Sequence, residues 1–264
     1  PGMAAGCLYL DYRTAGLQKS DLILIAARPS MGKTAFVLNI LDYVGVKKHE
    51  PVMIFSLEMS KEQLANRVLS LETQIEADKL RKGTLTDEEW GDLIEGVDRL
   101  SKANVFIDDT PGITVSELRG KCRKRKLESG LSLVMIDYLQ LMSGEKGKRS
   151  SENRQQEISE ISRSLKALAR ELDCPVIALS QLSRAVEQRP DHRPMLSDLR
   201  ESGAIEQDAD IVMFLYRDDY YNKDTEHPNE AEVIIAKQRN GPIGTVKLLW
   251  QPQYTRFKNA EKER

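Results

Sequence analysis

Cysteine is scarce in this chain, and its few occurrences follow no metal-binding pattern. The 264 residues include three cysteines, Cys7, Cys122 and Cys174, which have no metal-ligand spacing and cannot all pair with one another. Free thiols in a reducing compartment are the simplest interpretation, and we expect a cytoplasmic protein. Long apolar runs and a signal peptide are also lacking, since no run approaches the roughly eighteen apolar residues of a membrane span. We therefore expect no contact with a membrane.

The chain also lacks a strong net charge. Its formal charge is −2, from 39 Lys and Arg against 41 Asp and Glu. Without a global basic field, any nucleic acid must be bound by local loops. The 40% of hydrophobic residues can form a sizeable core. We find no internal repeat, no linker between domains and no helix at the start. We therefore expect one domain over residues 1–264 that is a fragment of a longer protein.

The usual first glycine of a phosphate-binding loop is missing at position 27, but the context of such a loop is complete. An apolar run at 22–26 is too short for a typical helix and predicts a buried strand, and residues 35–41 predict a helix. A tight loop with Gly-Lys-Thr lies between them, so that backbone N–H groups and the helix N-terminus could surround phosphate oxygens. The residues predicted to bind nucleotide are Ala27, Arg28, Pro29, Ser30, Met31, Gly32, Lys33 and Thr34.

Within this loop, Lys33 is predicted to reach the terminal phosphates of the nucleotide and the Thr34 hydroxyl to hold Mg²⁺. Ala27 is small enough to let the backbone close around the ligand. The alternative is a chance Gly-Lys-Thr in a loop between a strand and a helix.

Three further apolar runs end in a polar residue. They are residues 52–57 followed by Glu58, 131–136 followed by Asp137, and 175–180 followed by Gln181. Asp137 is predicted to support Mg²⁺, although many strands end in Asp for reasons of turn formation. Glu58 could polarise the attacking water, or it could be favoured by the helix that begins after it. Gln181 could touch the γ-phosphate, with ordinary turn chemistry as the alternative.

The remaining elements complete an α/β pattern. Residues 105–107 and 211–216 predict further strands, and Ser60, Thr86 and Thr114 predict helix N-caps. Apolar strands that alternate with helices indicate a mostly parallel central sheet with helices on both faces. The runs 231–236 and 245–250 flank Asn240-Gly241 and predict a C-terminal β-hairpin. Lys237 and Arg239 would lie at its tip, either for solubility or, in a ring of ATPases, to reach a neighbour.

Two polar segments follow the fourth strand. Residues 183–193 are basic and include Arg184, and residues 198–207 carry a glycine among polar side chains. We expect both at the same edge of the sheet as the phosphate-binding loop, where they could grip phosphodiesters through Arg side chains and backbone N–H groups. Aromatic residues are not interleaved, so stacking on bases is not indicated. The alternative is a pair of solvated loops.

Several motifs together resemble the DnaB-type bacterial replicative helicase family. They are residues 27–34, 55–60, 136–142, 180–184, 198–210 and 237–241. The resemblance implies a RecA-like P-loop NTPase fold, a homohexameric ring, and ATP-driven 5′→3′ translocation on single-stranded DNA that unwinds duplex DNA. It also implies that the family's N-terminal domain and most of its linker helix are absent here. Primase and a helicase loader are then expected partners of the full-length form.

The same resemblance implies a role for particular residues. Lys33 and Thr34 would bind phosphate and Mg²⁺ with support from Asp137, Glu58 would activate water, and Gln181 would sense the γ-phosphate. Lys237 and Arg239 would reach the neighbouring subunit's nucleotide. The residues implied to contact DNA are Arg184, Arg200, Glu201 and Gly203. Two alternatives remain at this point, a RecA-like recombination or filament ATPase and an ATP-regulated DNA-binding module without unwinding.

Overall fold

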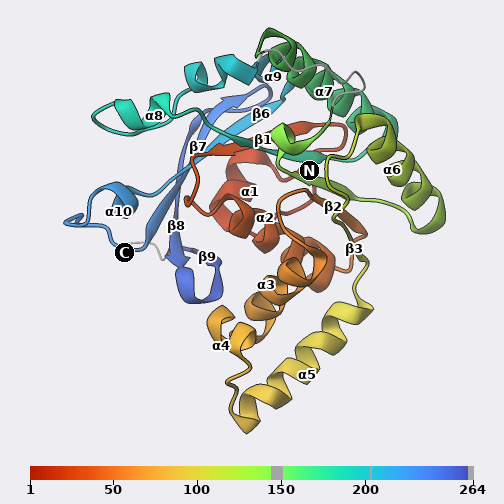
Figure 1. The fold of residues 1–264 in the computed structure, drawn as a ribbon, viewed down its shortest axis with the longest axis vertical. Coiled ribbons are helices and arrows are strands. Elements are labelled where there is room, and N and C mark those ends of the chain that lie inside the picture. Colours follow the sequence, from red (N-terminus) through yellow and green to blue (C-terminus); the bar gives the residue numbers. More distant parts are fainter. Residues whose placement is uncertain (144–150, 203, 261–264) are drawn as a thin grey trace.

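A computed structural model of the chain describes residues 1–143, 151–202 and 204–260. The described residues form a nine-stranded sheet with the order β3-β2-β4-β5-β1-β6-β7-β8-β9 (Figure 1). The strands are β1 (Leu22–Ala27), β2 (Val52–Ser56), β3 (Val105–Asp108), β4 (Leu133–Asp137), β5 (Val176–Gln181), β6 (Ile211–Tyr216), β7 (Glu230–Gln238), β8 (Gly244–Gln251) and β9 (Arg256–Asn259). The first six strands in this order pair in parallel and the last three antiparallel. The mostly parallel α/β sheet and the C-terminal hairpin are therefore confirmed.

Helices cover both faces of this sheet. The α-helices are α1 (Leu8–Thr14), α2 (Lys33–Leu41), α3 (Lys61–Thr73), α4 (Ala77–Lys82), α5 (Asp87–Lys102), α6 (Val115–Ser129), α7 (Ser151–Leu172), α8 (Ala185–Gln188), α9 (Ile205–Asp208) and α10 (Asp218–Tyr221). A π-helix, η1 (Asp42–Lys47), continues α2, and short 3₁₀ turns are η2 (Leu139–Leu141), η3 (Leu196–Ser202) and η4 (Pro252–Tyr254). α4 and α5 extend away from the sheet (Figure 1). No helix of the described ranges is long and apolar enough to cross a membrane.

The central strand β1 contributes to two hydrophobic cores. Ile23 and Ile25 pack with α1, α2 and α3 on one face, whereas Leu22 and Leu24 pack with α6 and α7 on the other. Every residue of β1 is buried. A strand that is covered on both faces needs apolar side chains at every position, and for this reason the parallel strands read as continuous apolar runs.

The predicted helix caps are confirmed. The Ser60 and Thr86 side chains each accept the N–H of the residue three positions later, and Gln63 and Glu89 complete the two capping boxes. Thr114 caps α6 in the same way, by accepting the N–H of Glu117. The three cysteines are buried and unpaired within the described part of the chain, as expected for free thiols.

The prediction that the chain starts without a helix was wrong. α1 is only seven residues long, and its stability comes from packing, because Leu10 and Thr14 are buried. The Asp11 carboxylate also accepts the N–H groups of Ala5 and Gly6, which fixes the segment before the helix. The last strand, β9, was not predicted either. It places the Phe257 ring 5.7 Å from that of Phe36 on α2, measured between centroids.

Candidate nucleotide-binding site

The phosphate-binding loop joins the end of β1 to the start of α2. Gly32 caps α2 with a φ of 93°, in the left-handed region that favours glycine. A Cβ at this position would lie 2.7 Å from the Phe257 ring, so position 32 requires glycine for space as well as for backbone conformation. The Leu182 N–H donates to the Ala27 carbonyl over 3.0 Å, which holds the loop against the end of β5. Strand, loop and helix are thus arranged as the sequence predicts.

An open cleft of about 620 Å³ lies over this loop. Six of the eight predicted loop residues line it, namely Arg28, Pro29, Ser30, Gly32, Lys33 and Thr34. Glu58, which follows β2, and Gln181, which ends β5, line the same cleft. Parallel strands bring their carboxyl ends to one edge of the sheet, so residues more than 140 positions apart meet there. The structure therefore brings the predicted catalytic residues Lys33, Glu58 and Gln181 together.

Asp137 and Thr34 form the predicted metal-binding pair. The Thr34 hydroxyl donates to Oδ2 of Asp137 over 2.8 Å. Asp137 is fully buried, and within the described part of the chain its Oδ1 has no hydrogen-bond partner. Burial raises the pKa of Asp137, while the Thr34 hydrogen bond and the Lys33 charge act to lower it. A hydroxyl and an unpartnered carboxylate oxygen side by side are ligands that Mg²⁺ prefers.

The Lys33 ammonium, which belongs to this cleft, lies over an aromatic ring. Its Nζ is 4.3 Å from the ring centroid of Tyr138. Burial lowers the pKa of Lys33, and the charges of Asp137 and Glu58 oppose that change. A partly desolvated cation next to an open cleft is suited to binding an anion, because little water must be removed from it on binding.

Arg67 is a further cation of the cleft that the sequence analysis missed. It lies on α3 and lines the cleft beside Lys33. Burial lowers the pKa of Arg67, and the carboxylates of Asp137 and Glu58 counteract the effect. A signal was present in the sequence, because Arg67 lies three positions after the buried Leu64 and therefore on the inward side of its helix.

Gln140 is a second residue without a predicted role. Its side-chain amide donates to the Ser180 hydroxyl over 2.9 Å and to the Gln181 carbonyl over 3.3 Å. Its carbonyl oxygen accepts the Gln181 N–H over 3.3 Å. Gln140 thus fixes the main chain on which the predicted phosphate sensor is carried. On the other side, Arg28 of the phosphate-binding loop donates to the Leu182 carbonyl over 2.7 Å.

Comparison with known proteins identifies the family of this site. Residues 2–259 match the family described as DnaB-like helicase C terminal domain. The chain belongs to this family. Over 261 residues it is 62% identical to the replicative DNA helicase DnaB of Geobacillus stearothermophilus, an alignment that covers 99% of this chain and 57% of the relative. It is 61% identical to the replicative DNA helicase DnaC of Bacillus subtilis over the same shares of both chains. The chain therefore spans somewhat more than half the length of these relatives.

Solved structures agree with the family assignment. One solved ATPase domain is 48% identical, with a TM-score of 0.94, and the match covers 99% of this chain and 92% of that one. A DnaB-like replicative helicase, whose structure was described with its interactions with primase, gives the same identity and TM-score over 99% of this chain and 62% of that one. The resemblance drawn from the motifs and the RecA-like fold are thus confirmed.

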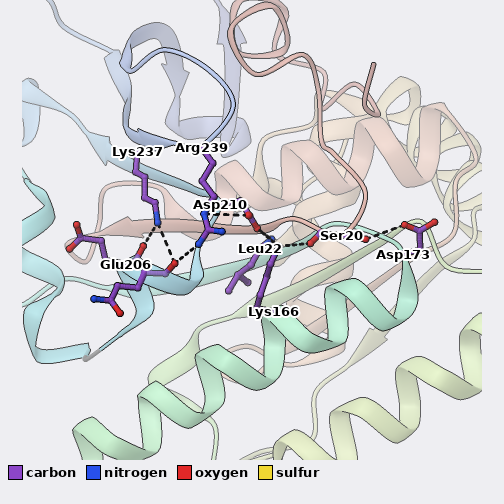
Figure 2. A network of polar contacts seen from close by, with 9 residues as sticks. Ser20, Leu22, Lys166, Asp173, Glu206, Asp210, Lys237 and Arg239 are labelled. Carbon is purple, nitrogen blue, oxygen red and sulfur yellow. Dashed lines mark hydrogen bonds and ion pairs between the residues drawn. The ribbon is translucent and has the colours of Figure 1, made fainter.

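Two residues predicted for the DnaB-like nucleotide site lie far from the cleft of their own chain. β7 runs antiparallel to β6, and its Gln238 pairs with Ile211, the first residue of β6. Lys237 and Arg239 therefore lie at the amino edge of the parallel strands, whereas the phosphate-binding loop lies at the carboxyl edge. Figure 2 shows Lys237 beside Glu206 and Arg239 beside Asp210 instead. Neither cation can contact a nucleotide in the cleft of its own chain. Their predicted contact is with the nucleotide of a neighbouring subunit.

The second predicted DNA-binding segment runs from one edge of the sheet to the other, which corrects the expectation that both segments lie at the edge of the phosphate-binding loop. Arg184 is exposed and lines a second open cleft of about 710 Å³ beside Arg28 and Gln181, at the carboxyl edge as predicted. The second segment starts at that edge, because Asp198 lines the same cleft, but it does not stay there. α9 ends at the amino edge, since β6 is parallel to β1 and the chain must return before β6 can begin.

The remaining DNA-binding predictions concern the centre of this second segment. The backbone of Arg200 and Glu201 belongs to η3, and Gly203 lies outside the described residues. Within the first turn of η3, the buried Asp198 accepts two hydrogen bonds from the Arg189 guanidinium, at 2.8 and 2.6 Å. This ion pair ties the first segment to the second.

Proposed function

We propose that this chain is the ATP-hydrolysing motor domain, over residues 1–264, of a replicative DNA helicase. The observation that supports this most directly is that Lys33, Thr34 and Glu58 line one cleft of a DnaB-like fold, with Asp137 hydrogen-bonded to Thr34 behind it. The chain matches 57% of the length of its curated relatives. The activity of the whole protein is inferred from this domain and from those relatives.

The residues of the cleft fit a nucleoside triphosphate with Mg²⁺. The unpartnered Oδ1 of Asp137 and the Thr34 hydroxyl would hold the metal ion, which would neutralise phosphate charge when bound. Lys33 and Arg67 would contact the terminal phosphates. The cleft volume of about 620 Å³ is in the range of small-molecule sites.

Hydrolysis would then follow the usual chemistry of this class of ATPase. Glu58 accepts a proton as a water molecule attacks the γ-phosphorus, and the bond from that phosphorus to the β–γ bridging oxygen breaks, which leaves ADP and phosphate. Lys33 stabilises the negative charge that develops on the phosphoryl oxygens. Gln181, held by Gln140, senses the loss of the γ-phosphate and passes the change to the segment that follows it.

Assembly into a homohexameric ring completes the site. The six residues of β6 rise roughly 3.3 Å each, so about 20 Å separates Lys237 and Arg239 from the edge at which their own chain binds nucleotide. In a ring, these cations would serve the neighbouring subunit's nucleotide, with Arg239 as an arginine finger. The segments that carry Arg184, Arg200, Glu201 and Gly203 would contact the backbone of single-stranded DNA, along which the ring would move 5′→3′.

The partners and location follow from the same role. The solved structure of one DnaB-like replicative helicase was described together with its interactions with primase. We propose primase and a helicase loader as partners of the full-length form. A motor of bacterial DNA replication acts in the cytoplasm.

Unwinding by the full-length protein tests the proposal. A forked duplex with a free 5′ single strand should be unwound with ATP and Mg²⁺, and a duplex with only a 3′ single strand should not. ATP turnover should rise when single-stranded DNA is added. Strand exchange without unwinding would favour a recombinase, and DNA binding without turnover would favour an ATP-regulated binding module.

A further inference from the structure

Asp210 is a buried carboxylate that joins three elements at the amino edge of the sheet. It lies just before β6, and its side chain is 9% exposed. Its Oδ2 accepts the Leu22 N–H of β1 over 2.8 Å and pairs with Nζ of Lys166 on α7 over 2.6 Å. Its Oδ1 lies 3.7 Å from Nε of Arg239 (Figure 2). One oxygen is therefore fixed by the core of the domain, and the other faces the hairpin.

The hairpin cations have further partners at the same place. Lys237 donates to the Glu206 carbonyl, and the Arg239 guanidinium donates to the Gln207 carbonyl, both over 2.5 Å. The Arg239 N–H donates to the Asp210 carbonyl over 3.0 Å. Arg239 is nevertheless 44% exposed, so part of its guanidinium remains open to solvent while the rest is held. A group that acts on another molecule must be fixed in position and must also be accessible. The Arg239 guanidinium meets both conditions.

We propose that Asp210 is a positioning residue for Arg239, which fixes the guanidinium at the sheet edge from which it reaches the neighbouring subunit. This inference rests on the proposed function, because it needs Arg239 to act across a subunit interface. Its physical basis is the asymmetry of the Asp210 carboxylate. Because β1 and α7 immobilise one oxygen, the direction of the other is set by the core and not by the exposed hairpin. An arginine on a hairpin with no such anchor would sample many rotamers, and few of them would fit a transition state.

The test uses the full-length assembled protein with Asp210→Asn, which keeps the shape of the side chain and an acceptor for the Leu22 N–H. We expect unchanged ATP affinity and a loss of about 10- to 100-fold in turnover, since small displacements of a catalytic group cost up to about 10²-fold. Asp173→Asn is the matched control. It removes another carboxylate from the same edge, one that accepts a hydrogen bond from Ser20 and not from the hairpin (Figure 2), and it should leave turnover unchanged.

Mixed assemblies separate a positioning role from a structural one. A subunit with Asp210→Asn retains its phosphate-binding loop and has a misplaced finger, so mixing it with Lys33→Ala subunits should recover turnover. Mixing it with Arg239→Ala subunits should not, because both then lack a working finger. The reverse pattern would show that Asp210→Asn damages its own nucleotide site, and the inference would be overturned.

A reference mixture of Lys33→Ala with Arg239→Ala distinguishes this failure from failure of the proposed function. If the reference does not recover turnover, Arg239 does not act across the interface, and both proposals fall. If the reference recovers and the Asp210 mixture does not, only the positioning role fails. Should Asp210→Asn not fold because Lys166 loses its counter-charge, the double variant Lys166→Met with Asp210→Asn removes both charges. The same pattern of recovery is then expected.

Discussion

Lys33 has no hydrogen-bond partner among the described residues. Its ammonium instead lies over the Tyr138 ring. An ammonium that is partly buried without a strong acceptor costs free energy in the folded state, and such a cost is retained where the group binds a ligand. The fold should therefore tolerate the loss of Lys33 better than the activity does.

Lys33→Ala should abolish ATP hydrolysis and leave the thermal unfolding midpoint close to that of the unchanged protein. Phosphate release measures turnover, and circular dichroism follows unfolding. Lys48→Ala is a fitting control, because Lys48 also lies over a tyrosine ring, that of Tyr43 at 5.5 Å, but is exposed and outside the cleft. Near-normal turnover in the Lys33 variant would show that the hydrolysed nucleotide is not bound at this cleft.

Glu58→Gln separates binding from chemistry at the same site. The amide keeps the shape of the side chain but cannot accept a proton from water, so turnover should fall by about 10²–10⁴. Nucleotide affinity, measured by titration calorimetry, should stay the same. Glu62→Gln changes an exposed carboxylate in the first turn of α3 and should have no effect on either quantity. A parallel loss of affinity and turnover would indicate that Glu58 is structural.

At the scale of elements, the π-helix η1 carries a buried carboxyl, Asp42, next to Glu72 of α3. Burial raises the pKa of Asp42 from its ordinary value of 3.8 to about 8, and the hydrogen bond and charge of Glu72 add to the rise, while Lys47 and Arg256 oppose it. Arg99 of α5 pairs with Glu72 over 2.9 Å from the other side. The folded protein therefore keeps a proton that the unfolded chain releases at low pH.

This pair predicts a pH dependence of stability. The contribution of Asp42 is fully present below about pH 4 and is lost as the pH rises towards about 8, because the unfolded chain gives up its proton first. Asp42→Asn has no proton to lose at this position. The unfolding midpoint of the variant minus that of the unchanged protein should therefore increase from pH 4 to pH 8. Asp98→Asn, at an exposed ion pair with Lys102, should show no such trend. Midpoint differences that are independent of pH would contradict the assignment.

The parallel strands and the conformation of the loop between β1 and α2 could be predicted from the sequence, because burial on both faces produces continuous apolar runs and because Gly-Lys-Thr marks a specific turn. α1 and β9 could not, since each is short and depends on distant partners, as Phe257 does on Phe36. Arg67 was missed because its only signal is its helical spacing from Leu64, which places it on the inward side of α3 but does not indicate a ligand. The path of residues 198–207 between the two edges depends on the pairing of β6 with β1, which is a property of the whole sheet.

At the scale of the whole molecule, the sheet separates the two parts of the proposed catalytic site. The cleft lies at one edge and Arg239 at the other, so each subunit is incomplete by itself if the proposed ring forms.

Arg239→Ala in the assembled full-length protein should bind ATP normally and lose roughly 10³–10⁵ in turnover, the range of arginine fingers. Mixed with Lys33→Ala, it should regain part of that activity where an intact cleft meets an intact finger. Light scattering with ATP and single-stranded DNA confirms that mixed assemblies form at the mass of the ring. A mixture as inactive as each variant alone would place Arg239 in its own subunit or outside catalysis.

The strand order has a consequence for how the protein is made. β1 leaves the ribosome first among the strands, yet its two neighbours in the sheet, β5 and β6, begin at residues 176 and 211. At roughly 5–20 residues per second, the all-apolar segment 22–27 waits on the order of 10 to 40 seconds for those partners. Unpaired apolar strands can pair with strands of other chains and so promote aggregation. Nascent chains of this protein should therefore depend on chaperones until the second half of the domain has been synthesised.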